Sequence, residues 1–167
     1  MLFTLITFLI TVSGRIAMSY EVVTIPTLKI IGIEHKTTNN NNQSVTDMPQ
    51  FWDNYFTKNI EISIPHKQEP LNRVCVYTDY NPEGYTVIIG ACVTSLETVP
   101  VHLVGREFPS SKYAVFTING PLETNVLKTW QHIWSIADLP RAYTHDFELY
   151  EYIGDNLQFA KVFVSIV

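Results

Sequence analysis

The apolar pattern of the chain begins with a strand-like segment and then breaks into a polar tract. Residues 20–34, YEVVTIPTLKIIGIE, are rich in β-branched residues and predict a strand, which Pro26 breaks or confines to a sheet edge. Residues 37–47 have no hydrophobic periodicity and predict a loop. Asp47 is suited to be an N-cap and Pro49 to occupy a first helical turn, so we expect a helix to begin there.

A helix and a hairpin are predicted next. Large apolar residues recur every three or four positions across residues 51–60, which is the spacing of an amphipathic helix. Two strand-like segments follow, at residues 73–80 and 85–94, and the Asn-Pro-Glu-Gly sequence between them favours a turn.

The same order of elements recurs in the second half of the chain. Residues 106–119 predict a strand with Pro109 near its start, and residues 122–139 have helical spacing. Residues 145–153 and 158–167 predict a second hairpin around a Gly-Asp-Asn turn. The second half therefore repeats the pattern of the first.

This recurrence predicts an α+β fold made of tandem duplicated β-α-β-β units. We expect one domain at residues 20–167, with the first repeat at about 20–95 and the second at about 106–167. The two units would form an antiparallel sheet with two helices on one face and a central ligand groove between them.

Aromatic residues occupy corresponding places in the two predicted repeats. On the helices, Trp52 and Phe56 match Trp130 and Trp134, each pair being four residues apart. Aligning the two hairpins by sequence matches Tyr77 with Phe147, Thr78 with Glu148, and Tyr80 with Tyr150. The alignment predicts a groove with a carboxylate on one side only.

Alternation along the last hairpin separates two sets of side chains. Phe147 and Leu149 point one way, and we expect them to face the helices, whereas Glu148, Tyr150 and Tyr152 point the other way. If that second face lines the groove, a carboxylate lies among aromatic rings, which is an arrangement that attracts organic cations. The alternative is a solvated glutamate beside an ordinary cross-strand aromatic surface.

Composition and charge narrow the classes of partner. The chain of 167 residues carries a net charge of −5 without a cluster of lysine and arginine, so direct nucleic-acid binding has no electrostatic source. No metal site or cofactor motif is present, and no hydrolytic triad signature. Cys75 and Cys92 lie in neighbouring predicted strands, either as buried thiols or as a cross-strand disulfide.

The N-terminal 19 residues form a separate extension. Residues 1–12 are almost wholly apolar, but the first arginine follows this run instead of preceding it, and the run is shorter than the roughly 20 residues of a membrane helix. We expect residues 1–17 to be an extension upstream of Met18 in a cytoplasmic protein that does not enter the membrane. A signal segment of an exported protein is the alternative.

Several segments together resemble the GyrI-like small-molecule-binding family, and in particular its stand-alone, integron-associated effector-binding members. These segments are VVTIPTLKIIGIE, MPQFWDNYF, VYTDYNPEGYTVIIGACV, FPSSKYAVFTINGP, TWQHIW and DFELYEYI, and the resemblance covers residues 20–167. It implies a tandem strand-helix-strand-strand fold like the ligand-binding domains of AraC-type and MerR-type activators, which respond to lipophilic cations.

The resemblance also implies site residues. The family's acidic residue lies in a Phe-Glu-x-Tyr pattern, which here assigns ligand binding to Glu148 and Tyr150. Looser correspondence adds aromatic walls from Tyr77, Tyr80, Trp130, Trp52, Phe116 and Trp134.

We therefore expect a stand-alone binder of a lipophilic or aromatic cation. Fewer than twenty residues precede the first strand, so a DNA-binding domain is not expected and an effect on transcription would need a protein partner. Two alternatives implied by the family are a small-molecule hydrolase that uses Glu148 with Tyr80 or Tyr150, and a gyrase-interacting protein. The sequence does not decide between monomer and homodimer.

Overall fold

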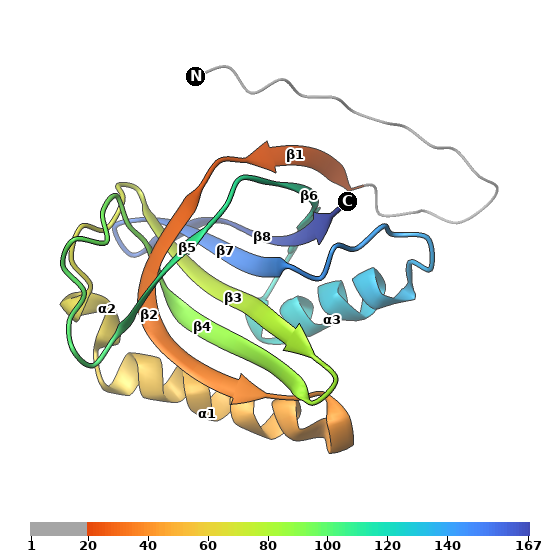
Figure 1. The fold of residues 1–167 in the computed structure, drawn as a ribbon, viewed down its shortest axis with the longest axis horizontal. Coiled ribbons are helices and arrows are strands. Elements are labelled where there is room, and N and C mark those ends of the chain that lie inside the picture. Colours follow the sequence, from red (N-terminus) through yellow and green to blue (C-terminus); the bar gives the residue numbers. More distant parts are fainter. Residues whose placement is uncertain (1–19) are drawn as a thin grey trace.

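The computed structural model describes residues 20–167, so the predicted N-terminal extension lies outside the described residues (Figure 1). In chain order, the elements are β1 (Glu21–Ile25), β2 (Leu28–Thr37), the short 3-10 helix η1 (Asn40–Asn42), α1 (Gln43–Thr57), α2 (Ile60–Ser63), β3 (Leu71–Asn81), β4 (Gly84–Cys92), β5 (Val104–Phe108), β6 (Ser111–Thr117), α3 (Leu122–Ser135), β7 (His145–Ile153) and β8 (Asn156–Ile166). No helix within residues 20–167 is long and apolar enough to cross a bilayer.

All eight strands form one antiparallel sheet in the order β1-β6-β8-β7-β3-β4-β2-β5. The predicted α+β class and antiparallel sheet are confirmed. The strand predicted at residues 20–34 is divided into β1 and β2 around Pro26, and that at 106–119 into β5 and β6 around Pro109. Proline has no N–H for a strand ladder, which explains both divisions.

The first helix begins earlier than predicted. Asn42 precedes α1 in the left-handed conformation, with φ 56°, so the helix starts at Gln43 and Asp47 is inside it instead of capping it. The Asp47 carboxylate accepts hydrogen bonds from the side chains of Thr37 and Gln43. Asparagine tolerates left-handed backbone better than most residues, so it can act as the junction. Pro49 consequently lies in the second turn and not in the first.

The helix α3 is shorter than predicted. It ends at Ser135, and Ile136 adopts an extended conformation with ψ 97°, although the apolar spacing had suggested helix as far as residue 139. Leu139 is buried beside α3 without being helical. A buried apolar residue can continue a periodic pattern beyond the end of a helix, because packing and not helicity sets the pattern.

Both long helices pack on the same face of the sheet. Buried residues of α1 share an apolar cluster with Cys75 and Ile89, and those of α3 share another with Tyr150 and Val162. The register pairs Cys75 with Glu148, so these two side chains share that face. Figure 1 shows α1 below β2 and β4, and α3 apart from it, to the right of β3.

Phe147 and Leu149 lie on the opposite face, which corrects the predicted orientation of β7. Phe147 belongs to a separate apolar cluster with Val76, Phe108 and Phe163, and Leu149 packs against it. The sheet curls around this cluster, so the face without helices is also buried. Glu148 is thus on the helix-covered face, although its alternation with Phe147 was predicted correctly.

The strand register also corrects the sequence alignment of the two hairpins. Thr78 pairs with His145, and because Tyr77 pairs with Asp146 on the helix-covered face, Thr78 points to the other face. Thr78 is therefore not the positional counterpart of Glu148.

The cysteines are both free and buried. Cys75 packs in the cluster beneath α1, whereas Cys92 packs in the cluster on the opposite face. The sheet separates the two thiols, so a disulfide between them does not form.

Candidate functional site

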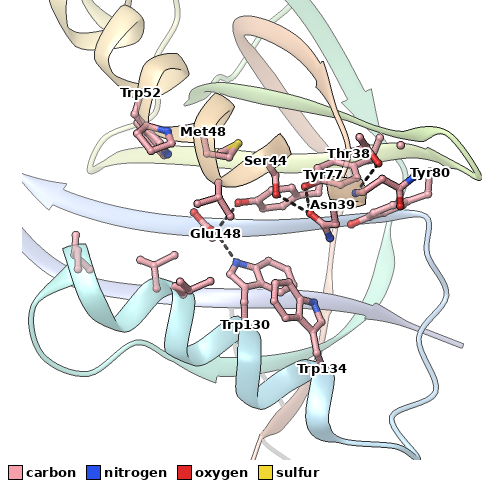
Figure 2. Close-up of a pocket in the computed structure, with 18 of the residues that line it drawn as sticks. Thr38, Asn39, Ser44, Met48, Trp52, Tyr77, Tyr80, Trp130, Trp134 and Glu148 are labelled. Carbon is pink, nitrogen blue, oxygen red and sulfur yellow. Dashed lines mark hydrogen bonds between the residues drawn. The ribbon is translucent and has the colours of Figure 1, made fainter. Parts of the chain in front are cut away.

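A pocket of about 910 Å³ lies between α1 and α3, with β3 and β7 as its floor (Figure 2). Its lining is mostly aromatic and aliphatic. Residues from α1 include Met48, Trp52 and Phe56; those from α3 include Leu122, Val126, Leu127, Trp130 and Trp134; the strands supply Arg73, Tyr77, Tyr80, Tyr85, Glu148, Tyr150 and Tyr152. The helices stand apart over the middle of the sheet and leave this space between them.

Glu148 projects from β7 into the floor of the pocket, with only 2% of its surface exposed. Its Oε1 accepts hydrogen bonds from the Tyr77 hydroxyl and the Trp130 indole N–H, both at 2.7 Å. Its Oε2 accepts one from the Tyr150 hydroxyl at 2.6 Å. All three donors are neutral, and within residues 20–167 no basic side chain forms an ion pair with Glu148.

Burial dominates the electrostatics of this carboxyl group. It raises the pKa of Glu148 above its ordinary value, against the lowering effect of the three hydrogen bonds. Burial, together with the neighbouring carboxylate, raises the pKa of Tyr77 and Tyr150 far above that of a free tyrosine. The two hydroxyls therefore remain protonated and act as donors.

Each helix presents a stacked pair of rings to the pocket. Trp52 and Phe56 of α1 stack with centroids 5.7 Å apart, and Trp130 and Trp134 of α3 stack at 6.1 Å. The inner ring of each pair also meets a floor tyrosine edge to face. Trp130 contacts Tyr77 at 5.2 Å, and Trp52 contacts the Tyr150 ring at 6.0 Å.

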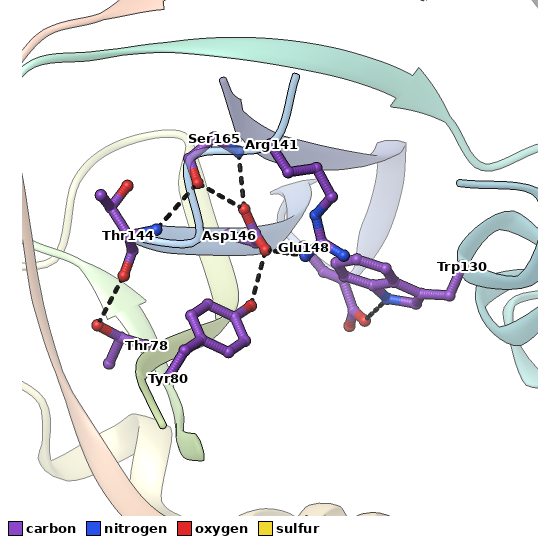
Figure 3. Close-up of polar contacts among 8 residues, drawn as sticks. All are labelled: Thr78, Tyr80, Trp130, Arg141, Thr144, Asp146, Glu148 and Ser165. Carbon is purple, nitrogen blue, oxygen red and sulfur yellow. Dashed lines mark hydrogen bonds and ion pairs between the residues drawn. The ribbon is translucent and has the colours of Figure 1, made fainter. Parts of the chain in front are cut away.

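A second buried carboxylate, Asp146, lies two residues before Glu148 on the same face (Figure 3). It forms an ion pair with Arg141 and accepts a hydrogen bond from the Tyr80 hydroxyl at 2.7 Å. Its other oxygen accepts from the backbone N–H and the hydroxyl of Ser165. This network ties the segment before β7 to β3 and β8.

Away from Asp146, the guanidinium of Arg73 lies over two aromatic rings that also line the pocket. Its guanidinium carbon lies 4.6 Å from the Tyr152 ring centroid and 5.1 Å from that of Phe56. The Nε and Nη2 atoms donate to the two oxygens of Glu61 at 2.6 and 2.9 Å. This bidentate pair holds the pKa of Glu61 below its usual range despite partial burial, and raises that of Arg73.

Seven of the eight residues predicted from the sequence line the pocket, namely Glu148, Tyr150, Tyr80, Tyr77, Trp130, Trp52 and Trp134. Phe116 does not; it is buried in the core beneath α3, beside Tyr20 and His132. Of the two tyrosines named as alternative partners of Glu148, Tyr150 donates to Glu148, whereas Tyr80 lines the pocket and donates to Asp146.

Sequence reasoning missed Arg73 and Arg141, which line the pocket, and Asp146, which pairs with Arg141. Asp146 could have been found, because alternation places it on the same face as Glu148. Arg73 and Arg141 carry no local signal. Their positions depend on the pairing of β3 with β7 and on the path of the segment after α3.

Comparison with known proteins agrees with this architecture. Residues 21–166 match the family model described as integron-associated effector binding protein. The curated YobU protein of Bacillus subtilis, described as a transcriptional regulator, is 28% identical over 124 residues, which cover 71% of this chain and 78% of that protein.

Two solved structures have similar folds. The integron cassette protein from the mobile metagenome of Vibrio cholerae aligns with a TM-score of 0.70 and 21% identity, over 89% of this chain and 95% of that one. The structure of SAV2435, bound to tetraphenylphosphonium, aligns with a TM-score of 0.73 and 15% identity, over 90% and 94%. At these identities the likeness is one of fold.

Proposed function

Because the chain belongs to the family of integron-associated effector binding proteins, we propose that it binds a lipophilic organic cation in the pocket between α1 and α3. The ligand's charge lies near Glu148, and its apolar groups lie between the stacked rings of the two helices.

The observation that carries this proposal is a buried carboxylate that has no cationic partner among residues 20–167. The three groups that contact Glu148 are neutral, so they satisfy its oxygens without cancelling its charge. Removing a carboxylate from water is costly unless an opposite charge compensates it. A bound cation supplies that charge, and the surrounding rings attract it further through their π faces.

The shape of the pocket supports an apolar cation over a small inorganic one. Its volume of about 910 Å³ falls within the roughly 300–1,000 Å³ typical of sites for organic ligands. The walls are largely indole, phenyl and aliphatic groups. SAV2435, which has a similar fold, was solved with tetraphenylphosphonium, a cation of this chemical class.

We also propose that the fold arose by duplication, with the pseudo-two-fold axis passing through the Cys75–Glu148 pair. Cys75 pairs with Ile89 on its other side and Glu148 pairs with Val162, so a rotation about this axis exchanges the two hairpins in register. The same rotation exchanges Tyr77 with Tyr150, the two tyrosines that donate to Glu148. The central groove between the repeats is then the pocket itself, with Glu148 near its axis.

The test is cation binding by a glutamine variant. Tetraphenylphosphonium binding is measured by quenching of tryptophan fluorescence and by calorimetry in the wild type and in Glu148→Gln. We expect the affinity to fall about 30-fold or more, because loss of a buried charge partner costs roughly 2 kcal/mol or more. The hydrogen-bonding shape of the side chain is largely kept, so the loss reports its charge.

Glu123→Gln is the matched control. Glu123 also lines the pocket, but it lies exposed in the first turn of α3. Its removal should change the affinity by about twofold or less, because exposed charges are screened by solvent. Equal effects of the two substitutions would contradict a specific role for Glu148, and absence of binding to the wild type would refute the proposal.

Hydrolysis of a small reactive compound is a second candidate, favoured by the contact between Glu148 and two protonated tyrosines. A carboxyl group with a raised pKa beside a hydroxyl donor is suited to general acid–base chemistry. Turnover of a panel of small electrophiles, lost in Glu148→Gln and retained in Glu123→Gln, would favour the enzyme. Saturable cation binding without turnover of any member favours the binder.

A further inference from the structure

We propose that Arg73 forms a second polar subsite, which binds a hydrogen-bond acceptor, above all a carboxylate, carried by the same ligand that places its cation at Glu148. This inference rests on the proposed function and narrows the ligand class. The preferred ligand is a bifunctional molecule with a cationic apolar head and an acceptor group at a short distance from it.

The guanidinium of Arg73 is held ready for such a contact. Glu61 occupies Nε and Nη2, while Nη1 forms no hydrogen bond with another residue in the range 20–167. Phe56 and Tyr152 flank the guanidinium, and all three residues line the pocket. A planar cation that is already restrained by an ion pair and two ring contacts loses little conformational freedom when an acceptor joins its open edge.

The two subsites are close enough for one small ligand. Arg73 pairs directly with Tyr150, whose hydroxyl donates to Glu148. Arg73 is two residues from Cys75 along β3, and Cys75 is the strand partner of Glu148. Two residues of a strand correspond to a backbone separation of roughly 7 Å. A spacer of a few carbon atoms between head and acceptor matches this separation.

Arg141 is a weaker candidate for the same role. Its partner Asp146 is completely buried, and its Nε atom is buried without a hydrogen-bond partner among the described residues. The two arginine side chains are equally exposed, at 14%, but the Glu61 side chain is 24% exposed, so solvent reaches the carboxylate of the Arg73–Glu61 pair and not that of the Arg141–Asp146 pair. The open edge for a ligand is at Arg73.

Two phosphonium compounds with the same aryl head test this inference. Butyltriphenylphosphonium carries only the cation, and (3-carboxypropyl)triphenylphosphonium adds a carboxylate on a three-carbon spacer. Calorimetry measures both in the wild type and in Arg73→Met, which keeps an apolar stem. We expect the substitution to weaken the carboxylate compound about tenfold and to change the butyl compound about threefold or less, the scale of a lost charge-assisted hydrogen bond.

A double variant, Arg73→Met with Glu61→Gln, removes the charge that Arg73 leaves unpaired on Glu61. The same selective loss is expected in it, and Arg73→Gln serves instead if the methionine variants do not fold. An unchanged ratio of the two affinities in the folded variants would overturn the inference while leaving the cation site intact. If neither compound binds to the wild type, the proposed function fails and the subsite fails with it.

Discussion

Two buried carboxylates, Asp146 and Glu148, occupy successive positions on the same face of β7 and have opposite electrostatic surroundings. Asp146 is neutralised by Arg141 and also accepts from Tyr80 and Ser165. Glu148 is as deeply buried but accepts only from neutral hydroxyl and indole groups. The charge of Asp146 is balanced by Arg141, whereas no basic side chain in the described part of the chain balances that of Glu148.

This difference separates a structural carboxylate from a binding one. Both are within hydrogen-bond distance of a tyrosine that lines the pocket, so neither burial nor aromatic company distinguishes them. What distinguishes the two carboxylates is a guanidinium group, which pairs with Asp146 but, among the described residues, not with Glu148. We infer that Asp146 contributes mainly to stability and Glu148 mainly to ligand binding. Three predictions test this division, beginning with the largest expected effect.

The largest effect is expected for Asp146→Asn. The substitution leaves the Arg141 charge without its partner in a site where the arginine side chain is only 14% exposed. Breaking a buried pair in this way costs about 3–5 kcal/mol of the free energy of unfolding. Urea unfolding followed by tryptophan fluorescence measures it.

Glu148→Gln is the comparison for that experiment, and it should cost about 1–2 kcal/mol or less, because it leaves no charge unpaired. Folded Asp146→Asn should retain cation affinity better than Glu148→Gln does. Equal losses of stability in the two variants would contradict the division of roles.

The second effect is a dependence of cation affinity on pH. Burial raises the pKa of Glu148 above its ordinary 4.5, so the carboxyl group holds its proton more tightly in the folded state than in the unfolded state. The protonated group therefore stabilises the fold at low pH, and this stabilisation is lost as the pH rises through the raised pKa. A bound cation favours the ionised form. Affinity should therefore increase with pH from about 4.5 up to that raised pKa, with release of a proton.

Calorimetry in buffers of different ionisation enthalpy counts the released proton. The Glu148→Gln variant should show a flat profile over the same pH range. A profile of the same slope in this variant would assign the titration to another group.

The smallest effects are expected for Tyr77→Phe and Tyr150→Phe. Each removes one hydrogen bond to Glu148 and keeps the aromatic ring, so each should raise the pKa of the carboxyl group further. The midpoint of the affinity profile should move upward by about one pH unit or less in both variants. Tyr85→Phe is the control, since the hydroxyl of Tyr85 donates to Asn39 and not to Glu148.

A comparable shift in the two tyrosine variants would agree with their proposed exchange about the pseudo-two-fold axis. A shift in only one of them would show that the two sides of Glu148 are not equivalent. A shift in Tyr85→Phe as large as theirs would remove the hydrogen-bond explanation.

Sequence patterns predicted much of the site because its residues come from regular elements. Alternation set Glu148 and Tyr150 on one face of a strand, and helical spacing paired Trp130 with Trp134; these features are local and depend only on backbone geometry. The start of α1 was missed because it depends on a left-handed Asn42, and nothing in the polar tract favoured this asparagine over its neighbours.

The face of β7 that is covered by the helices could not be predicted from the local pattern. Phe147 and Leu149 looked suited to a helix-covered core, but the sheet also buries its other face against an apolar cluster. When both faces of a sheet are buried, hydrophobicity no longer indicates which one carries the helices. The hairpin alignment matched Thr78 with Glu148 although these residues lie on opposite faces, because a shift by any odd number of residues reverses the face of every side chain.

The sequence by itself determined the order of the elements and the α+β class, and its resemblance to a known family singled out Glu148 as the candidate ligand-binding carboxylate. The tertiary structure alone decided which charges are paired. Arg141 neutralises Asp146, and Arg73 is held by Glu61, through contacts that depend on strand register and on where the segments between elements return to the sheet. Local pattern reports the period of a backbone, whereas charge pairing depends on distances between distant parts of the chain. Only the folded arrangement therefore shows that Glu148 has no basic partner within residues 20–167.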